Sequence, residues 1–488
     1  MLFRASSAVG PLLAPSPHSR LCCPFASLLR RHRHRKLHVY THGEGFLGCL
    51  GHGNFSALDE VQRVDGVAAV DIRQGSAGWT HSAAVDSQGR LLVWGRPYDF
   101  KGSLRLNNMQ RVFPILVRAV NAFSNRGEVM PEPVIVPIRT TAEVMAQPYR
   151  DDRSSLLTSI AAAATTATTS TRAPPPVPPS NTLMTNFKSG FGQRDYASMV
   201  DPTHAVSVSH GPAGPKAVGV ACSAALTVVL TERGRVYCMG QNRWGQCGQG
   251  PSGPDHVFEP LLVRGKALSK EKVVKLAIGF QHCLVLCESG AVYGWGKGER
   301  GQLGTGDDAS EELAVQVRLP GRAVCISSGF NHAVALLENG DAYIWGKMQH
   351  FEVKKEGGIP LHHDQLLPRK VDAEGVRYVE VFCSSFHTVL RADNGEVLMC
   401  GVERDTRRMV HKPVKVDMPG SGKGSFLNGF NETLFHTTTP EGRRRLYALT
   451  YTSEGAAASP FVLPGLDEAV VDEIESVSVG WKHTIALL

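Results

Sequence analysis

A pattern that recurs about every fifty residues limits this 488-residue chain to a small set of folds. The clearest copy is VVKLAIGFQHCLVLCESGAVYGWGKGERGQLGTG, from Val273 to Gly306. When further copies are aligned on its His282, the equivalent anchor positions are His81, Leu226, His332, His387, Glu432 and His483. One long interval, between His81 and Leu226, interrupts the spacing. Such periodicity is typical of repeat architectures, in which each repeat is one supersecondary unit.

Glycine and tryptophan recur in register with the anchor. A glycine follows the anchor by 14 residues in five copies, at Gly95, Gly240, Gly296, Gly346 and Gly401. A tryptophan precedes three of these glycines, at Trp94, Trp295 and Trp345. We interpret these residues as structural, together with the anchor histidines His81, His282, His332, His387 and His483.

Each copy has the pattern of short β-strands joined by turns. VVKLAIG, HCLVLC and AVYGWG are β-branched or aromatic runs, and a Glu-Ser-Gly turn separates the last two. Runs such as EPLLVR near Pro260 and HKPVKV near Pro413 supply a fourth strand at the edge, where proline is tolerated. Seven such units predict an all-β, seven-bladed β-propeller.

The last copy stops at Leu488, half-way through the pattern, and its second half lies near the other end of the chain. VYTHGEGFLGCLGHG, from Val39 to Gly53, aligns without a gap with VYGWGKGERGQLGTG, from Val292 to Gly306. We therefore predict that strands from both termini share one blade and close the ring, which leaves no strand edge unpaired at the seam.

The ordered elements G-x-x-H-[ST], [VL]-Y-x-W-G and G-Q-L-G-x-G resemble the repeats of the chromosome-condensation regulator (RCC-type) family, and most of all its mitochondrial members. The resemblance covers residues 37–120 and 215–488 and implies a seven-bladed propeller closed by strands from both termini. Leu226 and Glu432 at the anchor, and Cys247 in place of leucine, depart from the family pattern.

Residues 1–36 are rich in arginine and serine and contain no acidic residue, which is typical of a mitochondrial presequence. Leu21, Phe25, Leu28 and Leu29 fall on one face of a possible helix. We expect cleavage between about residues 30 and 38, and import into the matrix. The alternative is a basic tail that binds nucleic acid or a nuclear import receptor, and a nuclear location.

Charge and cysteine content narrow the function classes. Seven of the 52 lysines and arginines lie in residues 1–36, so the rest of the chain carries 45 basic and 45 acidic residues. The body is therefore not a nucleic-acid binder by bulk charge, although local patches stay possible. The eleven cysteines contain no CxxC pair, which favours thiols in a reducing compartment. No apolar run is long enough for a transmembrane helix.

The long interval holds an insertion at residues 121–214, within a single propeller domain spanning 37–488. It contains the low-complexity run AAAATTATTSTRAPPPVPPS, and we expect most of it to be disordered. PEPVIVPI, residues 131–138, is a candidate edge strand of the interrupted blade. The alternative is a flexible arm that docks onto a partner or RNA.

Motifs that suggest cofactor chemistry have simpler explanations. GKGERG at 296–301 joins two strands and recurs as GEGFLG, so repeat glycines explain it better than a dinucleotide site. GSGKGS at 420–425 lacks the other residues of a phosphate loop. The anchor histidines fall one per blade and are not expected to converge on a metal. We therefore predict no catalytic, cofactor-binding or metal-binding residues.

An aromatic residue stands two positions before the anchor in five copies, at Trp79, Phe280, Phe330, Phe430 and Trp481. These rings either pack between blades or crown one face and form a landing site for a partner.

Two classes of function follow. The first is a non-catalytic interaction scaffold in mitochondria, which we expect to be monomeric. The family resemblance implies protein partners and a role with the mitochondrial ribosome, its rRNA or organellar RNA metabolism. The second is a guanine-nucleotide exchange factor for a small or dynamin-like GTPase. Exchange needs no acid, base or nucleophile, only a surface that favours the nucleotide-free GTPase.

Overall fold

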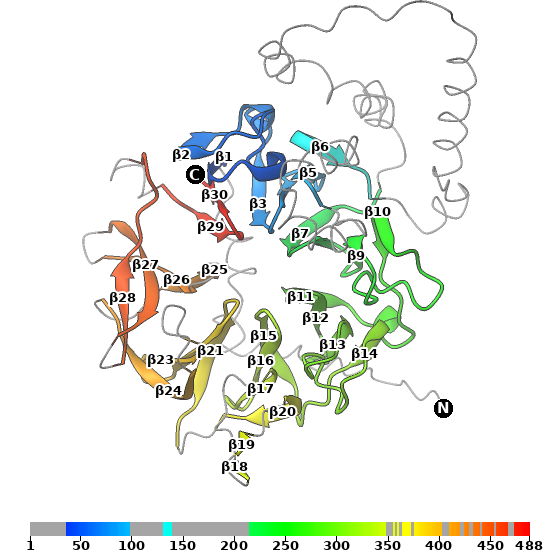
Figure 1. Cartoon of the computed structure of the whole chain (residues 1–488), viewed down its shortest axis with the longest axis vertical. Coiled ribbons are helices and arrows are strands. Elements are labelled where there is room, and N and C mark those ends of the chain that lie inside the picture. Colours follow the sequence, from blue (N-terminus) through cyan, green and yellow to red (C-terminus); the bar gives the residue numbers. More distant parts are fainter. Residues whose placement is uncertain are drawn as a thin grey trace, which may run out of the picture.

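The chain folds into a ring of β-sheets (Figure 1). The computed structural model describes residues 36–97, 130–138, 214–347, 355–356, 359–360, 364–371, 375–402, 409–419, 424–428, 433–439, 442–452, 455–466 and 473–488. The predicted presequence, except Lys36, and most of the predicted insertion lie outside these residues. The strands confirm the all-β class and the repeated four-stranded unit.

The described strands form five four-stranded sheets and one eight-stranded sheet, which consists of two further groups of four strands. We call each group of four a blade and name it by its first strand. The β3 blade contains β3 (Ile72–Ala77), β4 (His81–Asp86), β5 (Leu91–Gly95) and β6 (Met130–Val136). The β7 blade contains β7 (Ala217–Cys222), β8 (Leu226–Thr231), β9 (Val236–Gln241) and β10 (His256–Leu262). The β11 blade contains β11 (Val273–Ile278), β12 (His282–Cys287), β13 (Val292–Gly296) and β14 (Glu311–Gln316).

The remaining blades follow the same order. The β15 blade contains β15 (Ala323–Ser328), β16 (His332–Leu337), β17 (Ala342–Gly346) and β20 (Gln365–Lys370). The β21 blade contains β21 (Tyr378–Cys383), β22 (His387–Ala392), β23 (Val397–Val402) and β24 (Met409–Asp417). The β25 blade contains β25 (Ser425–Asn428), β26 (Thr433–Thr438), β27 (Arg444–Tyr451) and β28 (Ala456–Pro460). The closing blade contains β29 (Ser476–Val479), β30 (His483–Leu487), β1 (Val39–Gly43) and β2 (Leu58–Arg63).

The first strand of each blade lies nearest the middle of the ring (Figure 1). The β21 and β25 blades also meet at their outer strands, where β24 and β28 pair in parallel. A small hairpin, β18 (Lys355–Glu356) with β19 (Ile359–Pro360), projects from the β15 blade. Helices in the described part of the chain are single 3-10 turns, η2 (Phe46–Gly48), η3 (Asp65–Val67) and η6 (Leu268–Lys270), and none of them is able to cross a membrane.

Proline-containing runs supply outer strands, as the sequence predicts. β10 contains Pro260 and pairs with β9, and β24 contains Pro413 and pairs with β23. The candidate strand within the insertion is confirmed as β6, which pairs with β5. An outer strand can accept proline where one of its edges has no neighbouring strand to which it must donate. In β24 this holds at Pro413, because the pairing with β28 begins only at Val416.

The closing blade joins the two ends of the chain, which confirms the predicted closure. β1 pairs antiparallel with β30, from Val39 opposite Leu487 to Gly43 opposite His483. Ile485 and Leu487 are each 1% exposed and pack in one cluster with Ile72 of the β3 blade. The C-terminal strand therefore belongs to the core and supplies the face against which the next blade packs.

Strand register explains the 14-residue interval between anchor and glycine. The anchor begins the second strand, and the glycine is the last or next-to-last residue of the third. The two are direct partners in every described pair: His81 with Gly95, Leu226 with Gly240, His282 with Gly296, His332 with Gly346, and His387 with Gly401. Gly43 takes the same place opposite His483, so the column continues across the junction of the termini.

These glycines are needed for two reasons. Their φ angles are positive, for example +100° at Gly296 and Gly346. A Cβ at Gly346 would lie 2.5 Å from the carbonyl oxygen of Asn331, the residue before the anchor. An L side chain at this position is therefore strained in the backbone and also collides with the neighbouring strand.

Replacing Ile485 tests the role of the last strand. We expect Ile485→Ala to lower the free energy of unfolding by about 2–5 kcal/mol, because it opens a cavity in the core between two blades. The exposed Val462, which is 71% accessible, gives the matched control, and Val462→Ala should change stability by less than about 0.5 kcal/mol. Urea unfolding of both variants measures the difference, and equal stabilities would show that β30 is a dispensable tail.

A pair of glycine variants separates backbone strain from collision. Gly346 and Gly395 have φ angles of +100° and +88°, but a Cβ at Gly395 meets no atom within 4 Å. Both alanine variants lose about 1–2 kcal/mol through the left-handed backbone. We expect Gly346→Ala to lose about 1–3 kcal/mol more, because its methyl group is forced into a packed strand. Urea unfolding that gives the same loss for both would contradict the close approach.

Candidate interaction site at the central opening

The turns between first and second strands form a chain of contacts around the middle of the ring. The amide of Trp481 donates to the carbonyl of Gly78 at 3.2 Å, and that of Trp79 donates to Ser223 at 3.2 Å. The Ser223 hydroxyl donates to the carbonyl of Gly279 at 2.6 Å. Farther along, the amide of Phe280 donates to Phe330 at 3.1 Å, and that of Phe330 to Ser385 at 2.9 Å. These bonds link six consecutive blades and fix each turn relative to the next.

The anchor histidines support these turns from the interior. His81 Nε2 lies 2.9 Å from Thr227 Oγ1, and His282 Nε2 lies 2.8 Å from Ser328 Oγ. His483 Nε2 lies 2.8 Å from Ser82 Oγ, so each of these rings bonds a hydroxyl of the following blade. His387 differs, because its Nε2 donates to the carbonyl of Val402 in its own blade at 2.6 Å.

Burial keeps these imidazoles neutral. It lowers the pKa of His81, His282 and His332 to about 3 and that of His483 to about 4. Burial also lowers the pKa of His387, and the hydrogen bond of His387 to Val402 opposes this shift. A neutral ring can either donate or accept at Nε2, which suits a bond to a hydroxyl group.

The three predicted tryptophans lie in the interior between blades. Trp94, Trp295 and Trp345 are at most 1% exposed. Trp295 Nε1 donates to the carbonyl of Gln246 at 3.0 Å, and Trp345 Nε1 donates to Gln302 at 2.9 Å. Gln246 and Gln302 each lie in the glycine-rich loop between the third and fourth strands of the preceding blade.

The column of aromatic residues before the anchor converges on the central opening. Trp481 and Trp79 have ring centroids 5.4 Å apart, and Trp79 and Phe280 are 4.7 Å apart. Phe280 and Phe330 stack at 4.2 Å with an interplanar angle of 11°. Phe330 in turn stacks on Phe386 at 5.8 Å. We call Trp481, Trp79, Phe280, Phe330 and Phe386 the aromatic cap.

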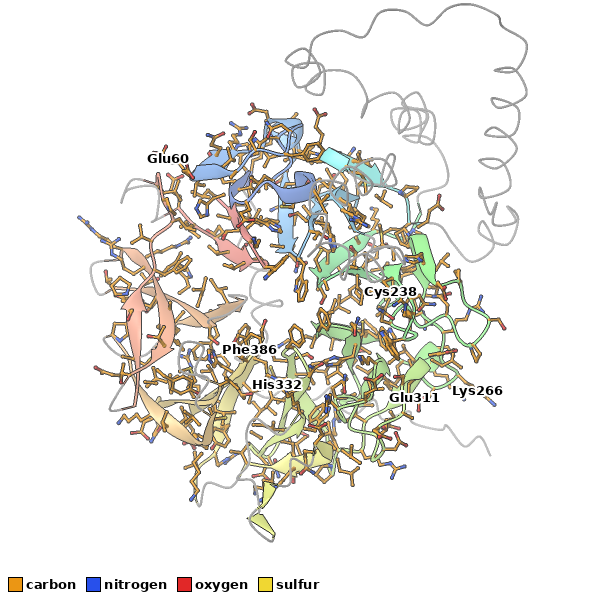
Figure 2. The ribbon with its side chains drawn as sticks, in the orientation of Figure 1. Glu60, Cys238, Lys266, Glu311, His332 and Phe386 are labelled. Carbon is orange, nitrogen blue, oxygen red and sulfur yellow. The ribbon has the colours of Figure 1, made fainter. Side chains whose placement is uncertain are left out.

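Four members of the aromatic cap belong to the predicted set, and the structure brings them together. The fifth predicted residue, Phe430, lies outside the described residues. Phe386 is the member that the sequence alignment missed, because it stands one position before its anchor and not two. It lies on the side of its blade that faces the middle of the ring (Figure 2). In the β7 blade Ala224 takes the aromatic position, so Trp79 reaches across that blade to Phe280.

A cavity of about 230 Å³ lies between the first strands next to the aromatic cap, whose Trp79, Phe280 and Phe330 line it. Lys275 and Glu380 are its charged residues, and Lys275 Nζ donates to Cys325 Sγ at 3.0 Å. Burial raises the pKa of Glu380, while Arg391, 3.1 Å away, and Lys275 oppose the shift. The aromatic cap therefore adjoins a partly polar channel and not a packed apolar core.

Basic residues lie around the aromatic cap. In three blades, the residue that follows the glycine paired with the anchor is basic. Its backbone amide donates to the carbonyl oxygen of the residue just before the anchor: Arg96 to Thr80 at 2.7 Å, Lys297 to Gln281 at 2.9 Å, and Lys347 to Asn331 at 2.8 Å. Lys482 follows Trp481 directly, and its Nζ lies 5.1 Å from that ring's centroid. Each basic residue is thus held beside a turn that carries a member of the aromatic cap.

Trp244, the sixth tryptophan of the chain, lies between β9 and β10 and is not a member of the aromatic cap. Trp244 belongs to the glycine-rich loop of the β7 blade, and Lys297 Nζ lies 4.4 Å over its ring. Sequence alignment gave no signal for Trp244, because the other loops have no tryptophan at this place.

Reactive chemistry has little support among the described side chains. No cluster of three or more His, Cys, Asp or Glu residues occurs among them in an arrangement that suits a metal. Burial raises the pKa of the Cys49, Cys222 and Cys383 thiols to about 12, so they stay protonated and unreactive.

Comparison with known families agrees with the repeat geometry. One family model of the regulator of chromosome condensation (RCC1) repeat matches residues 233–286 and 289–336. A second model of this repeat matches residues 72–100, 273–302 and 323–351.

Similar sequences occur in proteins of different kinds. The human E3 ubiquitin-protein ligase HERC2 is 27% identical over 292 residues, which are 59% of this chain and 5% of HERC2. The Arabidopsis thaliana ultraviolet-B receptor UVR8 is 25% identical over 286 residues, which are 58% of this chain and 54% of the receptor. The Bos taurus secretion-regulating guanine nucleotide exchange factor is 42% identical over 79 residues, 16% of each chain. The matches span about half of UVR8 and a small part of HERC2.

Solved structures share the fold over nearly the whole chain. Prp20p from Saccharomyces cerevisiae, described with its binding to Gsp1p and histones, has a TM-score of 0.56 and 16% identity and covers 93% of this chain and 91% of its own. Human WBSCR16 has a TM-score of 0.56 and 16% identity and covers 93% of this chain and 99% of its own. The chain is thus a propeller that carries RCC1-type repeats.

Proposed function

We propose that this chain is a non-catalytic interaction propeller whose partner docks on the face that carries the aromatic cap. The carrying observation is the convergence of aromatic rings from five blades, among which Trp481 is 43% exposed. Exposed aromatic residues at the centre of a surface are typical anchors of an interface. A propeller held together by buried turns offers such anchors at little cost in conformational entropy.

The location and partner form the finer part of the proposal. Residues 1–36 favour import into mitochondria, since they contain seven basic residues and no acidic residue. The similarity to mitochondrial members of the RCC-type family favours a role in ribosome assembly or organellar RNA metabolism. The partners would then be ribosomal proteins or rRNA.

Guanine-nucleotide exchange is the second candidate. It is favoured by the 42% identity to the secretion-regulating guanine nucleotide exchange factor over 79 residues. Prp20p, a propeller of similar fold, is described as binding Gsp1p, which also favours this candidate. In this case the face would hold a small or dynamin-like GTPase in its nucleotide-free state.

Purification from mitochondria tests the proposal. Tagged wild-type chain should retain ribosomal subunits or rRNA in moderate salt, and Trp481→Ala should retain at least about fivefold less. Phe55→Ala is the matched control, because Phe55 is 61% exposed but is not part of the aromatic cap. A GTPase retained only in the absence of nucleotide would favour exchange instead.

Two results would contradict this function. Equal retention by Trp481→Ala and wild type would remove the aromatic cap from the interface. A fluorescent reporter fused to residues 1–38 that stays in the cytosol or enters the nucleus would exclude the mitochondrial location.

A further inference from the structure

A lysine and a cysteine from neighbouring blades meet beside the central cavity. Lys275 Nζ, from β11, donates to Cys325 Sγ, from β15, at 3.0 Å. Both residues line the cavity of about 230 Å³ that adjoins the aromatic cap. A thiol sulfur is a weak hydrogen-bond acceptor, so the closeness of the two atoms has more consequence for their reactivity than for stability.

The repeat geometry places both side chains. Five first strands have a register irregularity after their first residue, and the first paired residue beyond it takes an equivalent position in each blade: Gln74, Gly219, Lys275, Cys325 and Glu380. Gln74 shows where such a side chain leads, because its Nε2 donates to the carbonyl of Val220 in the following blade at 3.0 Å. Lys275 reaches the following blade in the same way and meets Cys325 there.

A carboxylate completes the charged part of the cavity. Glu380 lines the cavity from the blade that follows Cys325. Burial raises the pKa of Glu380, and the positive charges of Arg391 and Lys275 oppose this rise. The thiol of Cys325 therefore shares the cavity with an ammonium group and a carboxyl group.

Three thiols line the cavity, and their surroundings distinguish them. Burial raises the pKa of Cys222 and Cys383 to about 12, so both stay protonated. Cys325 instead has the ammonium group of Lys275 directly beside it. A cationic neighbour is a usual feature of reactive cysteines, so Cys325 is the thiol of this cavity that we expect to react.

A small, uncharged oxidant is able to reach this pair. Cys325 is 1% exposed, so large reagents are excluded from its sulfur. The cavity has room for several molecules of the size of water, and dioxygen is of similar size. Apolar residues such as Ala277, Ile278 and Ile326 form part of the lining, which suits an uncharged molecule.

We propose that Lys275 and Cys325 form a modification site, at which dioxygen joins the two side chains through a single oxygen atom between Nζ and Sγ. One oxygen atom spans the gap of 3.0 Å with little movement, whereas a direct bond between sulfur and nitrogen would need a much closer approach. This inference is independent of the proposed function.

Atoms and electrons balance with dioxygen as the oxidant. One amine, one thiol and one dioxygen molecule give the bridge and one molecule of water. The nitrogen and the sulfur each lose one hydrogen atom and are each oxidised by two electrons. Dioxygen accepts all four electrons: one of its atoms becomes the bridge, and the other leaves as water with both hydrogen atoms. The additional proton of an ammonium group is released to solvent.

The bridge ties together two blades that carry stacked rings. β11 leads to Phe280 and β15 leads to Phe330, and these rings stack at 4.2 Å. The link closes a loop between residues that are 50 positions apart, which restricts the unfolded state, so the oxidised chain should resist urea better than the reduced chain. The site thereby couples oxidation to the face on which we expect a partner to dock.

Mass spectrometry of the full chain detects the bridge directly. The chain is purified with a thiol reductant, freed of it and kept in air-saturated buffer, and free thiols are blocked before digestion with trypsin. A modified Lys275 is not cleaved, so residues 273–297 should appear joined to residues 323–347. The joined mass should equal that of the two peptides plus one oxygen atom and minus two hydrogen atoms. A thiol reductant should separate the peptides, because it attacks the sulfur.

Matched variants assign the bridge to its two residues. Lys275→Arg and Cys325→Ser should abolish the joined peptide. Lys272→Arg changes an exposed lysine that pairs with Glu288 and keeps the trypsin site, and Cys383→Ser changes another thiol of the same cavity. Both controls should form as much joined peptide as the wild type. Circular dichroism of the reduced variants checks their fold, and the wild-type mass decides the inference even where a variant fails to fold.

Each contrary mass has a distinct meaning. A joined peptide without the extra oxygen atom would show a direct sulfur–nitrogen bond or a disulfide and would overturn the inference. Oxygen added to Cys325 while trypsin still cleaves after Lys275, or a thiol that stays free in air-saturated buffer, would overturn it as well. The proposed docking of a partner on the aromatic cap would stand in each of these cases.

Discussion

The pairing of β1 with β30 is the interaction on which the rest of the structure depends. It joins Val39 to Leu487 and Gly43 to His483, and so completes a blade from the two ends of the chain. A single repeat is unable to bury its apolar faces, and each blade needs a neighbour on both sides. Without this pair, Ile485 and Leu487 would leave the cluster that covers Ile72. Closure therefore provides the last of the contacts between blades.

The surface at the central opening follows from the same constraint. Because the Trp481 amide bonds Gly78 and the Trp79 amide bonds Ser223, the turn of each blade takes its position from the next. Neutral, buried histidines hold several of these turns to hydroxyl groups of the following blade, as His483 does with Ser82. The rings of the aromatic cap are therefore arranged by the closed ring, and binding to them requires little reordering.

The sequence was sufficient for the fold and for part of the site, and the division has physical causes. The interval of 14 residues between anchor and glycine is set by strand register, so it is visible as a spacing and predicts the strands correctly. The meeting of Trp79 with Phe280 depends on how far each turn reaches toward the axis, which no spacing along the chain records. Phe386 was missed because its turn places the ring one residue later than the others. The bonds from His81 to Thr227 and from His483 to Ser82 join different blades, so a pattern within one repeat does not show them.

Hydrogen exchange at the turn amides tests most directly whether ring closure positions the aromatic cap. In the wild type, the amides of Trp481, Trp79, Phe280 and Phe330 should be protected together, because each donates to a neighbouring blade. Weakening the last strand by Ile485→Ala should accelerate exchange at all four, including Phe280 and Phe330, which lie several blades from the closing blade. Acceleration confined to Trp481 and its own blade would contradict the account, since the turns would then be ordered independently of closure.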